Sequence, residues 1–389
     1  MTNRRLTIAC VAADLIPDKL GGAELHAVEV IKRLSQKHNL LIFVGQDTSI
    51  RQEFNQHVKV IPVNYPKIPN FYGISYVLFG YHQVLKYLKN QPINIIWAKQ
   101  EYPQAVLASL IKNRLKVPLY TTAQNPNLHR EELVVKGLII KPFHTILAKA
   151  LDPLINYSLQ NSDLVAAVSQ YSERLAKLKG ASQTTIIPNG IDLSKYQFSP
   201  HQIKSTLKII TTSSLIPRNG IDTLIRAVSL LPNSINWHLT IAGDGPLKVN
   251  IISQINNHKL ASKITLLGRV NNQDIPDLLS QSDLFIRPSR HEGFGISFIE
   301  AMASGIPVIG TPVGGIPDFL KPNQTGLSVK PDNPALLSQA IVRINKDKTL
   351  YKKLSWNAHQ LVSRSYSWDN ISCQVEQKML QLVKGTTKK

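Results

Sequence analysis

Glu292 and Glu300 flank a short segment whose residues suit the binding of an anion. Gly293 and Gly295 leave backbone N–H groups uncovered just before a predicted helix. These groups and the dipole of the helix favour a phosphate at the helix N-terminus. A carboxylate beside a phosphate is unfavourable unless it accepts hydrogen bonds from sugar hydroxyls. The pattern predicts an anion site; its structural alternative is that Glu300 only caps the helix and Glu292 is an ordinary loop acid.

Ser297 followed by Glu300 is the pattern of a capping box, which predicts that this helix begins at about Phe298. Gly305 is expected to end the helix, with Pro307 just beyond it. The segment therefore reads as strand, glycine-containing loop, helix and strand.

Short apolar runs rich in β-branched residues alternate with helical patterns along the chain. Most of the runs are continuously apolar, as strands buried on both faces are. Helical periodicity lies between them, for example over residues 23–34. This alternation predicts parallel sheets built from βαβ units. The predicted strands are Leu6–Ala12, Leu40–Val44, Val58–Val63, Ile93–Ala98, Leu119–Thr122, Leu164–Val168, Leu207–Thr212, Trp237–Ala242, Ile264–Leu267, Leu284–Ile286 and Pro307–Ile309.

The strand–helix pattern runs twice, and a polar stretch at residues 192–205 separates the two rounds. We expect an N-terminal domain at residues 1–200, a second domain at 201–365, and a C-terminal helix at 366–389 that packs back on the first domain. Ligands of open parallel sheets bind at the carboxyl ends of the strands, so two such domains face to face would form a cleft.

The chain of 389 residues has 45 Lys and Arg against 25 Asp and Glu, a net charge of +20. Nucleic acid, an anionic membrane and phosphorylated substrates are the candidate partners of so basic a chain. No nucleic-acid-binding module or basic–aromatic repeat accompanies the charge, so we expect no nucleic acid. Cys10 and Cys373 share no metal spacing and fit a reducing cytosol.

No uncharged apolar run of about 18 residues occurs, so we expect no transmembrane helix. The apolar run near the N-terminus is interrupted by Asp14 and Pro17, which favours a buried strand over a signal peptide. Residues 51–150 hold 13 basic and 4 acidic side chains. Within and near them, Phe71–Leu88 and Leu133–Ile155 could each be a surface helix on anionic lipid or an ordinary core helix.

The glutamate segment resembles the donor-site signature of retaining GT-B glycosyltransferases of family 4, the group 1 glycosyl transferases. Further resemblances follow in order along nearly the whole chain. They lie at Gly21–Glu24, Ser162–Ser169, Ile187–Asp192, Gly243–Pro246, Leu267–Val270 and Gly314–Gly315. The resemblance implies an α/β fold with two Rossmann-like parallel-sheet domains facing across a cleft. It also implies a retaining, metal-independent transfer of a hexosyl group from a nucleotide-diphosphate sugar, without a cofactor.

The resemblance also assigns roles to particular residues. Glu300 would hold the ribose hydroxyls of a UDP- or GDP-sugar, and Glu292 would face the donor sugar near its reacting carbon. The backbone near Val270 would meet the base, and Gly21 with Gly22 would approach the diphosphate. The backbone that would hold the sugar or its diphosphate is that of Phe294, Gly295, Ile296 and Ser297. No Asp-x-Asp occurs, in agreement with a site that has no metal.

The chain departs from the family at the positions that usually contact the diphosphate and the sugar. Ser214 and Asn219 stand where an arginine and a lysine are usual, and Arg218 lies one residue away. A charge-assisted contact to phosphate contributes roughly 1.5–3 kcal/mol, so the loss of two is large. We expect Arg218 to supply the charge, against the alternative that it is a solvated turn residue. Gln124 stands in place of a histidine, and an amide cannot transfer a proton as imidazole does.

The leading prediction is a retaining glycosyltransferase whose acceptor, a saccharide or a lipid-linked molecule, binds the N-terminal domain. The expected location is cytoplasmic, with a possible peripheral association with the inner face of an anionic membrane. The alternative is a non-catalytic GT-B relative that binds a sugar nucleotide or an anionic surface, which is suggested by the missing cation pair.

Overall fold

The computed structural model describes residues 5–13, 15, 21–68, 71–125, 141–198 and 205–386, with the backbone alone at 141–150. The contacts divide the chain into two compact units. Unit 1 comprises residues 1–189 together with 368–389, and unit 2 comprises residues 190–367. The sequence-based division places these boundaries at 200/201 and 365/366.

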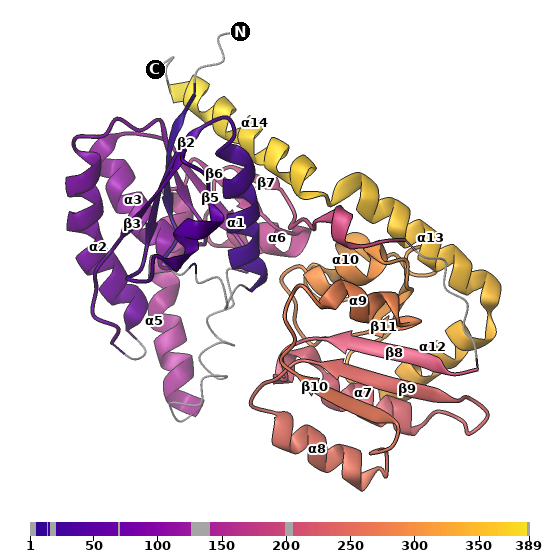
Figure 1. The fold of residues 1–389 in the computed structure, drawn as a ribbon. Helices are drawn as coiled ribbons and strands as arrows, with labels where there is room; N and C mark the ends of the chain where they lie inside the picture. The colour runs from indigo at the N-terminus through magenta and orange to yellow at the C-terminus, as the bar shows by residue number, and fades with distance from the viewer. Residues whose placement is uncertain are drawn as a thin grey trace. The chain divides into compact units, whose positions relative to one another are not determined.

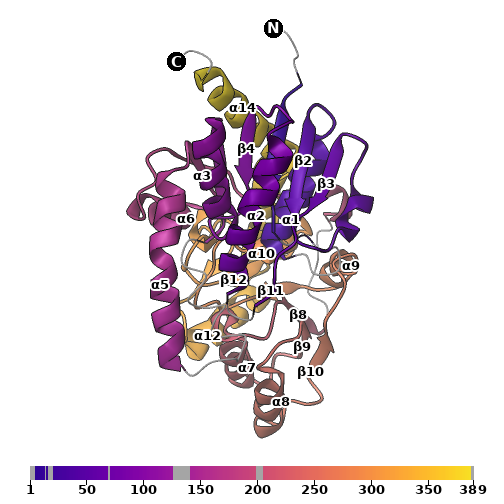
Figure 2. The same cartoon turned by 90° about the vertical axis from the view of Figure 1, so that its left-hand side faces the viewer.

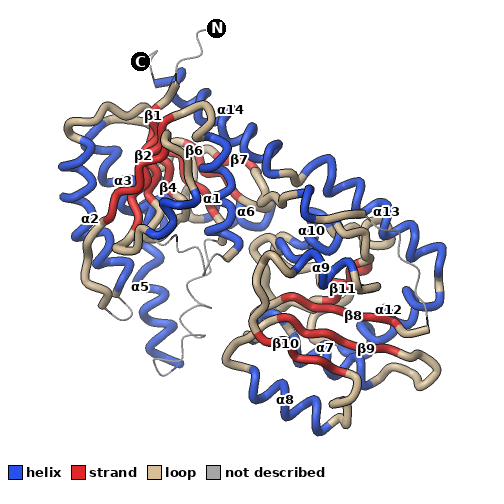
Figure 3. The backbone as a smooth tube through the Cα atoms, viewed as in Figure 1, coloured by secondary structure: helices blue, strands red, loops and turns tan. Residues whose placement is uncertain are grey.

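Unit 1 is built on a seven-stranded sheet whose pairings are all parallel, in the order β3-β2-β1-β4-β5-β6-β7 (Figure 3). The strands are β1 (Thr7–Val11), β2 (Asn39–Val44), β3 (Val58–Pro62), β4 (Ile95–Ala98), β5 (Leu119–Ala123), β6 (Leu164–Ala167) and β7 (Thr184–Ile186). The helices are α1 (Gly22–Leu34), η2 (Ser49–Glu53), α2 (Tyr72–Leu88), α3 (Gln104–Leu115), α5 (Lys141–Gln160), α6 (Gln170–Leu178) and α14 (Trp368–Thr386).

The alternation of side chains along β1 explains why both faces of this sheet are covered. Ala9 and Val11 belong to a core shared with α2, α3 and α5, whereas Ile8 and Cys10 belong to a core shared with α1 and α14. Successive side chains of a strand point to opposite faces, so a continuously apolar strand requires helices on both sides. Figures 1 and 2 show α2, α3 and α5 on one face of the sheet.

Unit 2 has a six-stranded parallel sheet in the order β10-β9-β8-β11-β12-β13. Helices α7, α8 and α12 lie against one face, and α9 and α10 lie on the other (Figure 1). The strands are β8 (Leu207–Thr212), β9 (Trp237–Ala242), β10 (Ile264–Gly268), β11 (Leu284–Ile286), β12 (Val308–Gly310) and β13 (Leu327–Ser328). The helices are η3 (Leu193–Lys195), η4 (Pro217–Asn219), α7 (Ile221–Ser229), α8 (Lys248–Asn257), α9 (Ile275–Ser280), α10 (Ile296–Ala303), α11 (Ile316–Phe319), α12 (Pro334–Lys346) and α13 (Lys348–Ser365).

The predicted fold class is confirmed: both units are Rossmann-like parallel sheets with helices on both faces. Each of the eleven predicted runs overlaps a strand of the structure. The sequence did not reveal β7 and β13, which have three and two residues and carry too few side chains to form a pattern.

Both sheets have a switch point at which the order of the strands reverses. In unit 1 it lies between β1 and β4, and in unit 2 between β8 and β11. The chain leaves the two central strands toward opposite sides of the sheet, and open parallel sheets bind ligands at the carboxyl ends of such strands. The loops after β8 and β11 are therefore the ones that the fold brings together in unit 2.

The aromatic helix α2 has both a core face and a surface face. Tyr76, Val77, Val84 and Leu88 are buried in the core, while Leu78 is 63% exposed. The second segment considered for a surface role, Leu133–Ile155, begins at residues 133–140, which lie outside the described part. Among the described residues, no helix is both long enough and apolar enough to cross a bilayer.

His26 on α1 allows a test of the core of unit 1. Its ring is buried and lies edge-on to the indole of Trp368 on α14, with ring centroids 5.7 Å apart. Burial lowers the pKa of His26 from 6.5 to about 4. The unfolded chain therefore binds a proton between pH 6.5 and 4 that the folded chain does not, so the folded state loses stability as the pH falls through this range.

We expect His26→Gln to reduce the fall in the free energy of unfolding between pH 7 and pH 5 by about 2 kcal/mol. Urea unfolding at the two pH values measures this difference. The matched change His82→Gln, at an exposed position on α2, should leave the fall unchanged. An equal fall in the wild-type chain and the His26 variant would contradict the assignment.

Candidate anion site at the carboxyl ends of beta strands

The predicted anion-binding helix is present, but it begins earlier than the sequence suggested. Helix α10 starts at Ile296, and Gly295 is its N-cap residue with φ of 106°. The predicted capping box is wrong, because the Ser297 hydroxyl bonds a guanidinium instead of capping the helix. A left-handed glycine starts the helix in its place. The expected end at Gly305 is confirmed, since the N–H of Gly305 donates to Met302 and that of Ile306 to Ala301, as in a Schellman motif.

Arg287, the first residue after β11, contacts residues on both sides of this glycine loop. Its side chain is 8% exposed. The guanidinium donates to the Glu292 carboxylate, to Ser297 Oγ at 2.7 Å and to Ser289 Oγ at 3.2 Å, and it lies 4.9 Å from the centre of the Phe298 ring. Burial lowers the pKa of Arg287, Glu292 opposes this effect, and the positive charge of Arg218 adds to it. Arg218 and Glu292 are therefore both close to this cation.

Glu292 is held on both sides. One carboxylate oxygen accepts from Arg287 and the other accepts from the Gly293 N–H at 3.0 Å. Its carbonyl oxygen accepts the Gly315 N–H, and a Cβ on Gly314 would lie 1.6 Å from that same oxygen. The glycine pair after β12 therefore fixes the backbone of Glu292. The Glu292 side chain is 19% exposed.

Glu300 lies one turn into α10 and is half-buried. Burial raises its pKa, and a hydrogen bond from Tyr196 together with the charge of Arg287 opposes that rise. Burial and the nearby Glu300 also raise the pKa of Tyr196, so its hydroxyl remains protonated and donates. The carboxylate of Glu300 is therefore oriented by Tyr196.

The loop after β8 places Arg218 beside the loop after β11. The Arg218 carbonyl accepts the Arg290 N–H at 2.6 Å. Gly220 has φ of 68°, and a Cβ there would lie 2.1 Å from the Pro288 carbonyl oxygen. The two loops are thus in backbone contact, as the switch point requires.

Arg290 fastens the same two loops through its side chain. Its guanidinium donates to the carboxylates of Asp222 at 2.7 and 2.9 Å and Asp332 at 2.7 Å, and to the Pro217 carbonyl oxygen at 2.5 Å. The pKa of Arg290 is raised, chiefly by its hydrogen bonds to Asp222. Both carboxylates therefore hold this guanidinium at the backbone of η4, next to Arg218.

Ser214 and Asn219, at the two positions where the family has cations, lie in the same loop. Ser214 is exposed, whereas Asn219 is buried and its amide donates to the Ser214 carbonyl oxygen at 2.8 Å. The Asn219 amide thus stabilises the loop. Gly243 and Gly245 pack on this loop from β9, since a Cβ on Gly243 would lie 1.8 Å from the Ser213 carbonyl oxygen.

The remaining predicted donor residues of unit 2 lie at the start of α10 or just after β10. Phe294 is buried and packs on the rings of Phe319 and Tyr366, so only its backbone can serve a ligand. Ile296 lies beside it at the first turn of α10. Val270 follows β10 and is half-buried at the carboxyl end of the sheet.

The predicted residues of unit 1 also lie at carboxyl ends of strands. Gly21 is the exposed N-cap residue of α1, and Gly22 is the first residue of that helix. A Cβ on Gly21 would lie 2.9 Å from a carboxylate oxygen of Glu24. Glu24 accepts a 2.6 Å bond from Lys99, which is 1% exposed and directly follows β4. A partly buried ion pair therefore lies beside the glycine loop at the switch point of this sheet.

Gln124, at the carboxyl end of β5, is paired with another amide. It exchanges hydrogen bonds of 3.2 and 3.4 Å with Asn189, and both side chains are buried. The buried carboxylate of Glu101 accepts the backbone N–H groups of Gln124 and Asn125, both at 3.2 Å. The contact of Gln124 with a donor sugar stays a prediction, and the amide pair fixes the orientation of the Gln124 side chain.

Sequence reasoning missed five polar residues that organise the two sites. Arg287 and Arg290 stand inside or beside the glutamate motif, but the pattern of glycines and glutamates does not single them out. Lys99 and Glu101 follow a predicted strand, and that position was an available signal. Tyr196 had no signal, because its partner Glu300 is distant in sequence. The five residues are Lys99, Glu101, Tyr196, Arg287 and Arg290.

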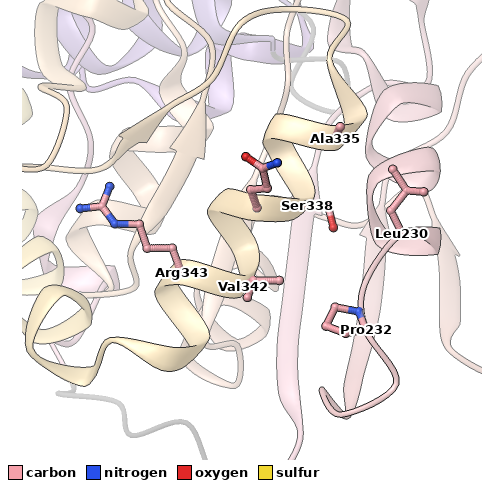
Figure 4. Close-up of a pocket in the computed structure, with 7 residues that line it drawn as sticks. Leu230, Pro232, Ala335, Ser338, Val342 and Arg343 are labelled. Atoms are coloured by element: carbon pink, nitrogen blue, oxygen red, sulfur yellow. The ribbon is translucent and has the colours of Figure 1, made fainter.

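A separate groove of about 430 Å³ lies on unit 2 between the end of α7 and helix α12 (Figure 4). Leu230 and Pro232 line one side, and Val342 and Arg343 line the other. None of the predicted site residues lines it. Within the described ranges, no group of three His, Cys, Asp or Glu side chains is placed to hold a metal ion.

Two family models match consecutive parts of the chain. The model described as glycosyl transferases group 1 matches residues 194–361, and the model described as glycosyltransferase family 4 matches residues 20–195. The two matches fall almost entirely on unit 2 and unit 1 respectively.

Relatives of similar length are also found. The chain is 27% identical over 351 residues to an uncharacterized glycosyltransferase of Methanocaldococcus jannaschii, covering 90% of this chain and 92% of the relative. It is 23% identical over 372 residues to N-acetyl-alpha-D-glucosaminyl L-malate synthase of Bacillus anthracis, covering 92% and 93%.

Solved structures resemble the chain in fold. Anabaena HepE in complex with UDP-glucose matches with a TM-score of 0.75 and 21% identity, covering 97% of this chain and all of that one. Sucrose-phosphate synthase from Thermosynechococcus elongatus matches with a TM-score of 0.81 and 22% identity, covering 98% and 100%.

Gly314→Ala tests whether the glycine pair fixes the Glu292 loop. A methyl group there would overlap the Glu292 carbonyl oxygen, and φ of 56° already disfavours a side chain. We expect unit 2 to lose roughly 2–4 kcal/mol of stability, measured by urea unfolding. Gly385→Ala, where a Cβ meets nothing within 4 Å, is the matched control and should be neutral or slightly stabilising. Equal effects of both changes would refute the role given to Gly314.

Proposed function

The chain is a group 1 glycosyl transferase with a GT-B fold, and from this premise we propose that it moves a hexosyl group from a UDP- or GDP-sugar to an acceptor with retention of configuration. The observation that carries the proposal is the cluster at the start of α10. There Arg218, Arg287, Glu292 and Glu300 surround a helix N-terminus at the switch point of the unit 2 sheet.

In the proposed reaction, the bond between the anomeric carbon and the diphosphate breaks, and the acceptor oxygen bonds to the same face of that carbon. Negative charge grows on the leaving diphosphate while the sugar becomes cationic. The N–H groups at the start of α10 and the Arg218 guanidinium stabilise the diphosphate. Glu292 faces the sugar, and Glu300 holds the ribose hydroxyls. The proton of the acceptor passes to an oxygen of the donor phosphate.

The same cluster supports a reaction that does not depend on a metal. The positive charge that the leaving group needs is provided by the Arg218 guanidinium and by the N-terminus of the helix. In unit 1, the Gly21–Gly22 turn has no side chain that would block a diphosphate, which is consistent with the role expected for it. We therefore expect chelators to leave the activity unchanged.

The relatives differ in the donors and acceptors that their names state. HepE was solved with UDP-glucose, and one relative from Mycobacterium tuberculosis is named as a GDP-mannose-dependent mannosyltransferase acting on a phosphatidylinositol mannoside. The relative from Bacillus anthracis is named for a product in which the sugar is joined to L-malate. A saccharide or a lipid-linked acceptor remains our proposal for this chain.

A thermal-shift screen against UDP- and GDP-sugars, followed by assays of donor hydrolysis and transfer, tests the proposal. A bound donor raises the melting temperature, because only the folded state binds it. We expect Glu292→Ala and Arg218→Ala to lower kcat/KM by roughly 10²–10³-fold, as when a group that stabilises transition-state charge is removed. NMR of the product should show the anomeric configuration of the donor, and EDTA should have no effect.

Arg226→Ala is the matched control, because this exposed arginine on α7 bonds Asp222 on its own helix, and Asp222 keeps its two shorter bonds to Arg290 without it. It should retain full activity. A wild-type chain that neither binds nor turns over any donor would refute the proposal. Normal donor binding without turnover would favour the non-catalytic alternative.

The surface of α2 supports an acceptor presented at a membrane. Residues 67–89 contain three lysines and no carboxylate. Four large apolar side chains of this region are between 45% and 63% exposed, and the lysines at both ends are exposed as well. An apolar strip between cations is the arrangement that anionic lipid favours. The exposed apolar residues are Ile68, Phe71, Leu78 and Phe79. We propose that this surface rests on the cytoplasmic face of an anionic membrane.

Sedimentation with vesicles tests this part of the proposal. The wild-type chain should bind vesicles that contain anionic phosphatidylglycerol more tightly than neutral phosphatidylcholine vesicles. Leu78→Glu should reduce that binding by roughly 10-fold, since an apolar side chain that would enter the bilayer is replaced by a carboxylate that anionic lipid repels. Leu178→Glu on α6 is the control, because Leu178 is 83% exposed but lies outside this surface. Equal losses in both variants would show that net charge alone governs the binding.

A further inference from the structure

The charges around the start of α10 are unusual for a site that takes a diphosphate. Three arginines and four carboxylates lie close together there, so the cluster has an excess of negative charge. Arg290 contributes little to an anion, because Asp222 and Asp332 both pair with it. The charges nearest the proposed diphosphate are therefore those of Arg218, Arg287, Glu292 and Glu300.

Arg287 is the most deeply buried charge of this group, and protein atoms occupy its guanidinium. The guanidinium is buried, and its three nitrogens donate to Ser289, Ser297 and Glu292. Burying a charge costs free energy unless that charge is paired and hydrogen-bonded, as Arg287 is here. Two of those partners, Ser297 and Glu292, belong to the segment that the proposed function assigns to the donor.

We propose that Arg287 is a positioning residue. It neutralises the Glu292 carboxylate, so that this carboxylate is tolerated beside the diphosphate. It also orients the Ser297 hydroxyl toward the diphosphate. This inference rests on the proposed function and names a residue that makes the donor site usable. The charge balance gives the first half of the argument. Without Arg287, the carboxylate of Glu292 would repel the two phosphates across a partly desolvated space.

The geometry of Ser297 supports a bond from its hydroxyl to the diphosphate. Its oxygen accepts from Arg287 at 2.7 Å, and a hydroxyl that accepts one bond still has a proton to donate. A hydrogen bond from a cation polarises the acceptor, which strengthens the bond that the hydroxyl donates in turn. Ser297 lies in the first turn of α10, where the backbone N–H groups also favour an anion. The cation thus acts on the diphosphate through Ser297.

A double-mutant cycle with two ligands tests the proposal. The variants are Arg287→Met, Glu292→Gln and the two combined, and Arg226→Met is the control. Calorimetry measures the Kd of the intact chain for UDP and for uridine, or for GDP and guanosine if the donor screen selects that base. Uridine lacks the phosphates, so its binding reports whether the site is still folded. Comparing the two ligands separates loss of charge balance from loss of structure.

We expect Arg287→Met to weaken UDP binding by roughly 10–100-fold, the range for one uncompensated charge, while uridine binding changes by less than about 3-fold. Adding Glu292→Gln should recover most of the UDP affinity, because no carboxylate is then left unpaired. Arg287→Lys should keep part of the affinity, since it retains the charge but not the three-way geometry.

Two results would overturn the inference. Equal losses of UDP and uridine affinity in Arg287→Met would assign Arg287 a purely structural role. Failure of Glu292→Gln to recover UDP affinity would show that neutralisation of Glu292 is not its function. A wild-type chain that binds no nucleotide at all would instead refute the proposed function, so the two failures are distinguishable.

Discussion

The parallel pairing of β8 with β11 is the constraint on which the site of unit 2 depends. Because these strands are neighbours with their carboxyl ends at the same edge, the loops that follow them must meet there. One loop carries Arg218 and the other carries Glu292, which are 74 positions apart in the printed sequence. Their proximity needs no side-chain attraction; the topology of the sheet brings it about.

Backbone contacts then make this meeting rigid. Gly220 touches the Pro288 carbonyl, Gly314 touches the Glu292 carbonyl, and Gly243 touches the Ser213 carbonyl, each at a separation that a methyl group would violate. Arg290 adds a charged fastening between the same loops. A site made in this way has little freedom in its main chain, so its chemistry can be varied by changing side chains while the frame is retained.

The sequence predicted the parts of the molecule that depend on local patterns. Apolar runs such as Trp237–Ala242 predicted strands with the observed bounds, because a strand buried on both faces leaves a continuous signature. The capping box at Ser297 failed because a partner outside the local window, Arg287, takes the hydroxyl. Arg287 itself was missed for the same reason: its importance arises from burial and from three bonds that only the fold creates. Local rules cannot anticipate such competition.

The return of α14 to unit 1 has a consequence for synthesis on the ribosome. Trp368, Ile371, Val375 and Met379 complete the core beneath α1, yet they are translated only after the whole of unit 2. Unit 2 is continuous from residue 190 to 367 and emerges whole before them. The part of this apolar face that α14 covers therefore stays exposed while unit 2 is made, and a chaperone would act on that part of the nascent chain.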